Sequence, residues 1–111
     1  MPFVDPTTLP IKEPLPGWKG RFFNSAEMMF GYYEVEAGAA IHEHAHPNEE
    51  VWHVIAGEVE LTIAGVAHVA TAGSAAIVPP NTPHAVRVSS PARVIVVDHP
   101  RRPAIGGVVL E

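Results

Sequence analysis

Short runs of alternating hydrophobic and polar residues dominate the middle of this chain. Residues 58–63 read EVELTI, and residues 50–56 read EVWHVIA. Alternation over about four to eight residues, with many β-branched and aromatic side chains, is typical of half-buried β-strands. We predict strands over residues 28–35, 50–56, 58–63, 66–70, 75–78, 84–88 and 93–98.

Proline and glycine separate these runs and exclude long helices. Proline occurs 12 times and glycine 9 times. The longest segment that lacks both is Arg21–Phe30, which is shorter than an average helix of about 11–12 residues. Within it, Asn24 and Glu27 resemble a helix-capping pair, so at most one short helical turn is expected there. Several short strands at close spacing predict an all-β sandwich or barrel, and we prefer the barrel.

The chain divides into three predicted parts. Residues 1–20 form an extended arm, because five of the first sixteen residues are proline. Residues 21–100 form one β-barrel domain, since 111 residues are too few for two stable cores. Residues 101–111 form a C-terminal tail. The arm is expected to lie along its own domain, with a partner subunit as the alternative.

Composition and charge exclude several classes of function. Seven Lys and Arg against 12 Asp and Glu give a net charge of −5, so no basic face for a nucleic acid is predicted. The absence of cysteine excludes disulfides and thiolate metal sites. Prolines and acidic residues interrupt every apolar stretch near the N-terminus. We therefore predict neither a signal peptide nor a membrane span, and expect a cytoplasmic location.

Seven histidines in so short a chain are its most unusual feature. His42, His44 and His46 alternate, so in a regular strand their side chains share one face. A turn at Pro47-Asn48 then leads to a strand that begins with Glu50, and a hairpin can bring imidazoles and a carboxylate together. Such ligands suit one divalent transition metal ion: Fe, Mn, Ni, Zn, Cu or Co.

His84 is the candidate for the remaining ligand. It opens a predicted strand directly after the segment PPNTP, far from the other histidines in the chain. Closure of a barrel brings such a remote strand next to a hairpin. Burying these polar groups without a cation would require a hydrogen bond for each of them, which favours a metal site.

The histidine-rich stretch resembles the first sequence motif of the cupin family. That motif is G(X)5HXH(X)3E(X)6G, and it is met in register by Gly38, His44, His46, Glu50 and Gly57. A chance match is improbable, at roughly 2 × 10⁻⁶ for each window of sequence.

The second cupin motif, G(X)5PXG(X)2H(X)3N, is met in part. Gly73, Pro79 and His84 are in register. Asn81 stands where the motif has glycine, and Val88 stands where it has asparagine. Asparagine tolerates the left-handed backbone that glycine adopts, so we expect the first departure to preserve the turn.

The resemblance covers residues 30–100 and implies a small single-domain cupin. Its fold would be an all-β, double-stranded β-barrel of the jelly-roll type, with a metal between the sheets. The run of alternating histidines followed by proline is also similar to small cupins of uronate and pectin metabolism. The metal ligands that the resemblance implies are His44, His46, Glu50 and His84.

Five further residues are candidates for the pocket around the metal. His42 is the predicted catalytic proton-transfer group, since an imidazole beside a metal suits this role at neutral pH; a histidine at the rim is the alternative. Trp52 has the strand parity of the carboxylate ligand and is expected to line the pocket or the core. Of the adjacent Tyr32 and Tyr33, one faces inward. Arg21 is the candidate anchor for a carboxylate substrate.

These features favour a metal-dependent enzyme that acts on a small polar metabolite. Dioxygenase, isomerase and lyase chemistry are all compatible with the site. The alternative is a non-catalytic metal-binding, ligand-binding or sensor cupin. Beyond the small-molecule ligand, neither a nucleic acid nor a membrane is an expected partner. Outward-facing Val51, Ile55 and Val97 predict a homodimer that covers them.

Overall fold

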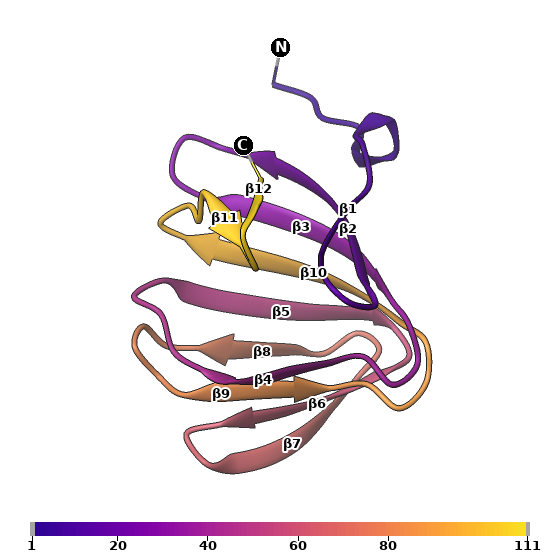
Figure 1. The fold of residues 1–111 in the computed structure, drawn as a ribbon, viewed down its shortest axis with the longest axis vertical. Coiled ribbons are helices and arrows are strands. Elements are labelled where there is room, and N and C mark those ends of the chain that lie inside the picture. The colour runs from indigo at the N-terminus through magenta and orange to yellow at the C-terminus, as the bar shows by residue number, and fades with distance from the viewer. Residues whose placement is uncertain (1, 111) are drawn as a thin grey trace.

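The chain folds into two facing sheets, and nearly all of its regular structure is β-strand (Figure 1). The computed structural model describes residues 2–110. In that range the short 3-10 helix η1 spans Pro6–Thr8, and no described helix is long or apolar enough to cross a bilayer. The strands are β1 (Lys12–Leu15), β2 (Trp18–Asn24), β3 (Met29–Val35), β4 (Ala40–His44), β5 (Glu49–Ala56), β6 (Glu58–Ile63), β7 (Val66–Thr71), β8 (Ala75–Val78), β9 (His84–Arg87), β10 (Ala92–His99), β11 (Ala104–Ile105) and β12 (Val108–Val109).

The order of the strands brings distant segments of the chain side by side. The larger sheet has the order β1-β2-β3-β10-β5-β8, and the smaller sheet has the order β4-β9-β6-β7. The C-terminal hairpin β11-β12 lies next to the larger sheet (Figure 1). The pairings are antiparallel throughout, and the two sheets form the predicted jelly-roll barrel of a single domain.

Inward-facing side chains fill the space between the sheets. In β10 every second residue is buried, from Ala92 to Asp98. The rings of Trp18 and Trp52 pack edge to face with their centroids 5.6 Å apart. Each fully buried large apolar side chain contributes about 1.5–3 kcal/mol by leaving water. The alternation that predicts the strands therefore also identifies the core.

The predicted strands are present, and their ends differ from the prediction by at most one residue. The short helical turn that the sequence allows within Arg21–Phe30 does not form. Strand β2 continues to Asn24 because its whole length pairs with β3. A tight turn follows, in which the Ser25 N–H donates to the Met28 carbonyl at 2.9 Å.

The two terminal segments take more part in the fold than the sequence indicates. Residues 12–20, predicted to belong to the arm, form β1 and the start of β2 at one edge of the larger sheet. Pro14 is tolerated in β1 because this is an edge strand. In the predicted tail, β11 and β12 pair with each other and Leu110 is buried. The folded unit therefore extends beyond residues 21–100 in both directions.

Two tight turns require a left-handed backbone. Gly57, between β5 and β6, has φ 79°, and a Cβ there would lie 2.7 Å from the Pro91 carbonyl oxygen. Asn81, between β8 and β9, has φ 60°, which confirms that asparagine replaces the motif glycine without loss of the turn. The Asn81 N–H donates to the His46 carbonyl at 2.7 Å, so a hydrogen bond joins this turn to the segment that carries His46.

Candidate metal centre

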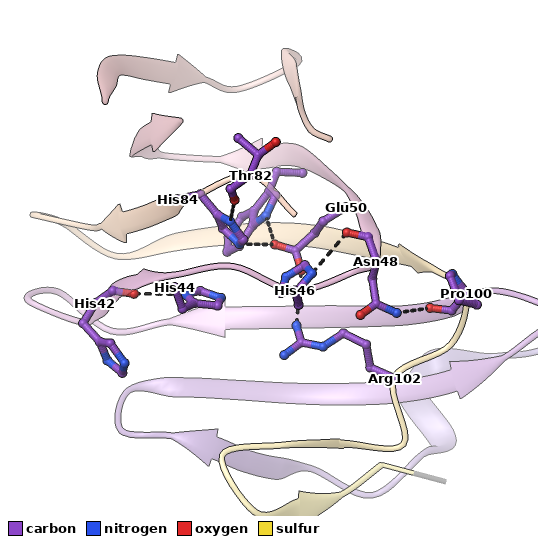
Figure 2. Close-up of polar contacts among 10 residues, drawn as sticks. His42, His44, His46, Asn48, Glu50, Thr82, His84, Pro100 and Arg102 are labelled. Carbon is purple, nitrogen blue, oxygen red and sulfur yellow. Dashed lines mark hydrogen bonds and ion pairs between the residues drawn. The ribbon is translucent and has the colours of Figure 1, made fainter. Parts of the chain in front are cut away.

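Three histidine side chains converge between the two sheets (Figure 2). His44 ends β4 and pairs with His84 at the start of β9, and His46 follows in the turn that leads to β5. Their ligand atoms all lie within 4.8 Å of one another. Glu50 approaches them from β5 in the opposite sheet, so the predicted ligand set comes together in space.

A β-bulge in β4 separates His42 from this cluster. Ile41 pairs with Val86, but His44 pairs with His84, so three residues of β4 match two of β9. The bulge turns the exposed His42 ring away from the other histidines, and its centroid lies 6.2 Å from that of His44 (Figure 2). The expectation that His42 shares their face is wrong, and its side chain does not line the cavity.

Backbone hydrogen bonds orient all three histidine rings in the same way. The Nδ1 atoms of His44, His46 and His84 lie 2.9, 3.1 and 2.8 Å from the carbonyl oxygens of His42, Asn48 and Thr82. Because a carbonyl accepts, each Nδ1 carries the proton and each Nε2 presents a lone pair to the site. Among the described residues, the buried Nε2 atoms of His46 and His84 have no hydrogen-bond partner.

The Glu50 carboxylate is buried against these nitrogen atoms and is only 3% exposed. Its Oε2 lies 3.4 Å from His46 Nε2, and its Oε1 lies 3.6 Å from His84 Nε2. Trp52 Nε1 donates to Oε1 at 2.6 Å and holds the carboxylate in place. Burial alone would raise the pKa of Glu50, but the neighbouring imidazoles hold that pKa well below its usual value. The carboxylate is therefore ionised and available as a ligand.

The donor set fits a divalent transition metal. Three imidazoles and one carboxylate supply the nitrogen and oxygen ligands that such an ion prefers. Burial lowers the pKa of His44 and so favours its neutral, metal-binding form. Burial also opposes protonation of His84, yet the adjacent Glu50 carboxylate outweighs it and raises the pKa of that imidazole. The residues present could thus hold an ion whose ligands are His44, His46, Glu50 and His84.

A second polar group, Asp98 of β10, lies beside the carboxylate ligand. Asp98 is fully buried, and among the described residues neither of its carboxylate oxygens has a hydrogen-bond partner. Burial, followed by the negative charge of Glu50, raises the pKa of Asp98 to about 9. At neutral pH this carboxyl group carries a proton. Burial together with the charges of Asp98 and Glu50 likewise raises the pKa of the Tyr33 phenol.

A narrow cavity with apolar and polar walls opens next to these groups, and about 40 Å³ of it can be reached by a water-sized group. Trp52 and Tyr33 line it, as expected of Trp52 and of one tyrosine. Arg102 and Ile105 reach it from the C-terminal segment. Its full lining is Pro14, Leu15, Trp18, Tyr33, Ile41, His44, Glu50, Trp52, Val96, Asp98, Arg102 and Ile105.

Tyr32 and Arg21 lie on the other face of the larger sheet, which corrects their assignment to this pocket. They are paired positions of β3 and β2, and strand alternation places Tyr33 inward and Tyr32 outward. Arg21 Nη1 donates to the carbonyls of Thr7 and Leu9 at 2.8 and 2.7 Å. The role of Arg21 is to fasten the N-terminal arm to the sheet.

Sequence reasoning missed Asp98 and Arg102 as site residues. A signal exists for Asp98, because it has the same strand parity as the buried Val94 and Val96. No such signal exists for Arg102, since it follows β10 and precedes the hairpin in an irregular segment. His53, His68 and His99 are exposed and outside the cavity lining.

The family model for the cupin domain matches residues 31–98 of this chain. The chain belongs to the cupin family. No curated protein matches it by sequence. The similarity to solved structures extends over nearly the whole chain. The four candidate metal ligands lie at positions of the two cupin motifs.

Three solved cupin structures illustrate this likeness. An RmlC-like cupin from Shewanella frigidimarina is 27% identical, with a TM-score of 0.85 over 92% of this chain and 93% of its own. KdgF from Halomonas sp. is 22% identical, with a TM-score of 0.83 over 90% and 95%. Oxalate decarboxylase from Bacillus subtilis, which has Mn(II) centres, is 17% identical, with a TM-score of 0.75 over 87% and 29%.

Proposed function

We propose that this cupin is a metal-dependent enzyme that acts on a small polar metabolite. The observation that carries the proposal is the clustering of three histidine ligand atoms beside a buried, ionised Glu50 at the wall of a cavity, with the Nε2 atoms of His46 and His84 unpartnered among the described residues. A metal that served only as a structural staple would not need a cavity with further polar groups beside it. Here Asp98 and Arg102 line the cavity together with His44 and Glu50.

A bound divalent ion would polarise a carbonyl or hydroxyl oxygen of the substrate. The four ligands suit Fe, Mn, Ni, Zn, Cu or Co, and manganese is the first ion to test because oxalate decarboxylase, of the same fold, has Mn(II) centres. Trp18 and Trp52 pack against each other at the cavity wall and exclude water from the reacting groups.

Asp98 is the group best suited to move a proton in this cavity. Burial and the neighbouring Glu50 raise its pKa, and it lies beside a proposed metal ligand. A buried carboxyl group with a raised pKa is the kind that general acid catalysis uses. This favours proton-transfer chemistry, of the isomerase or lyase type, over dioxygenase chemistry, and it gives Asp98 the role first expected of His42.

The cavity restricts the substrate to a small molecule. The space inside it that a water-sized group can reach is only about 40 Å³, and a single water needs about 10–15 Å³ of such space. Its lining joins aromatic walls to a few polar groups, an arrangement that orients a compact metabolite with several oxygen atoms.

Solvent-proton exchange tests the proposed reaction class. The Mn²⁺-loaded protein is incubated in D₂O with small 2-hydroxy and 2-keto compounds, and NMR follows deuterium incorporation and conversion. We expect exchange with the wild type, its loss in Asp98→Asn with the metal retained, and wild-type exchange in the control His68→Ala. A fully loaded wild type without exchange or conversion would favour the alternative, a non-catalytic metal-binding, ligand-binding or sensor cupin.

A further inference from the structure

We infer that Arg102 forms a carboxylate-binding subsite, which becomes available when a metal ion takes over its partner Glu50. The inference names the substrate class of the proposed enzyme and rests on that proposal, since it requires a metal at the histidine cluster. Three features carry the inference: the contacts of Arg102, the hydrogen bonds that hold the segment around Arg102, and the charges in the cavity.

Arg102 is the arginine that lines the cavity. Its Nη1 lies 3.3 Å from Glu50 Oε2, and its side chain is 19% exposed (Figure 2). Two other arginines are engaged elsewhere: Arg21 binds backbone carbonyls, and Arg87 pairs with Glu60 at 2.8 Å on the surface. The ion pair of Arg102 is therefore directed at a metal ligand, whereas these arginines bind structural partners.

The segment that carries Arg102 is fastened on both sides of it. Before it, Asn48 Nδ2 donates to the Pro100 carbonyl. After it, Lys12 Nζ donates to the Val109 carbonyl at 3.0 Å, and the buried Leu110 has its N–H bonded to the Pro103 carbonyl at 2.9 Å. These contacts fix the backbone around Arg102, so its guanidinium is a positioned group at the cavity wall.

Arg102 and Glu50 form an ion pair at the cavity wall while no metal is bound. A divalent ion on Glu50 and the histidines would add two positive charges next to aromatic walls. Unbalanced charge in a low-dielectric cavity is costly, so the loaded site favours an anionic ligand.

A carboxylate matches both the charge and the shape of this subsite. The planar fork of an arginine binds a carboxylate through two parallel hydrogen bonds. In the structure Glu50 contacts one Nη1 of this fork, and as a metal ligand it would direct its charge to the ion instead. A small 2-hydroxy or 2-keto acid would place its carboxylate on Arg102 and its second oxygen toward the histidines.

Isothermal titration calorimetry tests this inference. It compares the binding of lactate with that of its neutral isostere, lactamide. We expect lactate to bind the Mn²⁺-loaded wild type about tenfold or more tighter than the metal-free protein, and tighter than lactamide. Arg102→Gln should weaken lactate binding about tenfold or more, and Arg102→Lys should weaken it less. The matched control Arg101→Gln changes an exposed neighbour and should stay within about twofold of the wild type.

The affinity for Mn²⁺ alone separates this inference from the proposed function. Arg102→Gln should bind Mn²⁺ at least as tightly as the wild type, because a positive charge beside Glu50 is removed. Wild-type lactate affinity in Arg102→Gln, equal binding of lactamide, or tighter binding of inorganic phosphate would overturn the carboxylate subsite. A wild type that binds Mn²⁺ but not lactate would also overturn it while leaving the metal site intact. Failure to bind any of the six metals would overturn the proposed function itself.

Discussion

The buried Asp98 is the residue whose chemistry departs most from its ordinary behaviour. It ends the inward-facing row of β10 and lies next to Glu50, with Tyr33 and Arg102 also close to it. A carboxyl with a pKa of about 9 in the folded state and 3.8 as its ordinary value binds its proton more tightly when the protein is folded. Its contribution to stability is therefore greatest at low pH and is lost as the pH rises toward 9.

Asp98→Asn should remove this pH dependence. In metal-free protein, the wild-type midpoint of thermal unfolding is expected to fall between pH 6 and pH 9, because unfolding releases the Asp98 proton and a higher pH favours that release. The asparagine variant has no such proton, so its midpoint should change less and exceed that of the wild type most at pH 9. Circular dichroism at both pH values measures the difference. Parallel pH dependence in the two proteins would contradict the assigned protonation state.

The metal ligands could be predicted from the sequence because their spacing is local. His44, His46 and Glu50 lie within one hairpin, where strand parity and motif register agree. The prediction for His42 is wrong because a single extra residue in β4 reverses parity, and nothing in the local sequence marks that bulge. Arg102 could not be predicted, since its position depends on how the chain returns to the site after β10.

Among the structural elements, the turn from β5 to β6 has little tolerance for change. Gly57 has a left-handed backbone and lies against the chain between β9 and β10, where a Cβ would meet the Pro91 carbonyl at 2.7 Å. Gly38 has a similar φ of 85° at the start of the same motif, but a Cβ there has nothing within 4 Å. The two motif glycines thus have similar φ angles but different contacts at the Cβ position.

This contrast predicts unequal effects of the same substitution. Gly38→Ala should cost about 1 kcal/mol for the strained φ. Gly57→Ala should cost about 2–4 kcal/mol, because the clash with backbone adds to that strain. Urea unfolding of both variants measures the difference. Equal destabilisation would show that the contact with Pro91 is relieved by a small movement and that the fold does not depend on it.

Strands could be predicted better than the parts that join them. Each predicted strand from β3 to β10 is present, and each of its ends lies within one residue of the prediction. The N-terminal β1 contains Pro14 and the hairpin β11-β12 has strands of only two residues, so neither carries a recognisable period. These elements are held by contacts with the rest of the fold, and local sequence does not encode such contacts.

For the whole molecule, the outer face of the larger sheet is the surface that favours self-association. Val51 pairs with Val97 of β10 on one side and with Ile77 of β8 on the other, and all three side chains face away from the core. Ile77 is 61% exposed. A continuous apolar area on a sheet face is typical of an interface, and a second copy of this chain is the partner that we propose.

Light scattering at micromolar concentration should therefore give the mass of a dimer. Val51→Glu should shift the protein to a monomer, because it places a charge at the centre of the apolar face. The control Val66→Glu changes an equally apolar exposed residue on β7 of the other sheet and should leave the dimer intact. A monomeric wild type, or equal behaviour of the two variants, would refute this interface.

The central claim is that His44, His46, Glu50 and His84 bind one divalent metal ion. Elemental analysis of protein purified without added metal, and then equilibrated with each candidate ion, tests it most directly. We predict close to one transition-metal ion per chain in the wild type and in the control His68→Ala, and loss of the ion in His44→Ala and Glu50→Ala with the fold retained. A folded wild type that binds none of these metals, or variants that keep wild-type stoichiometry, would contradict the account.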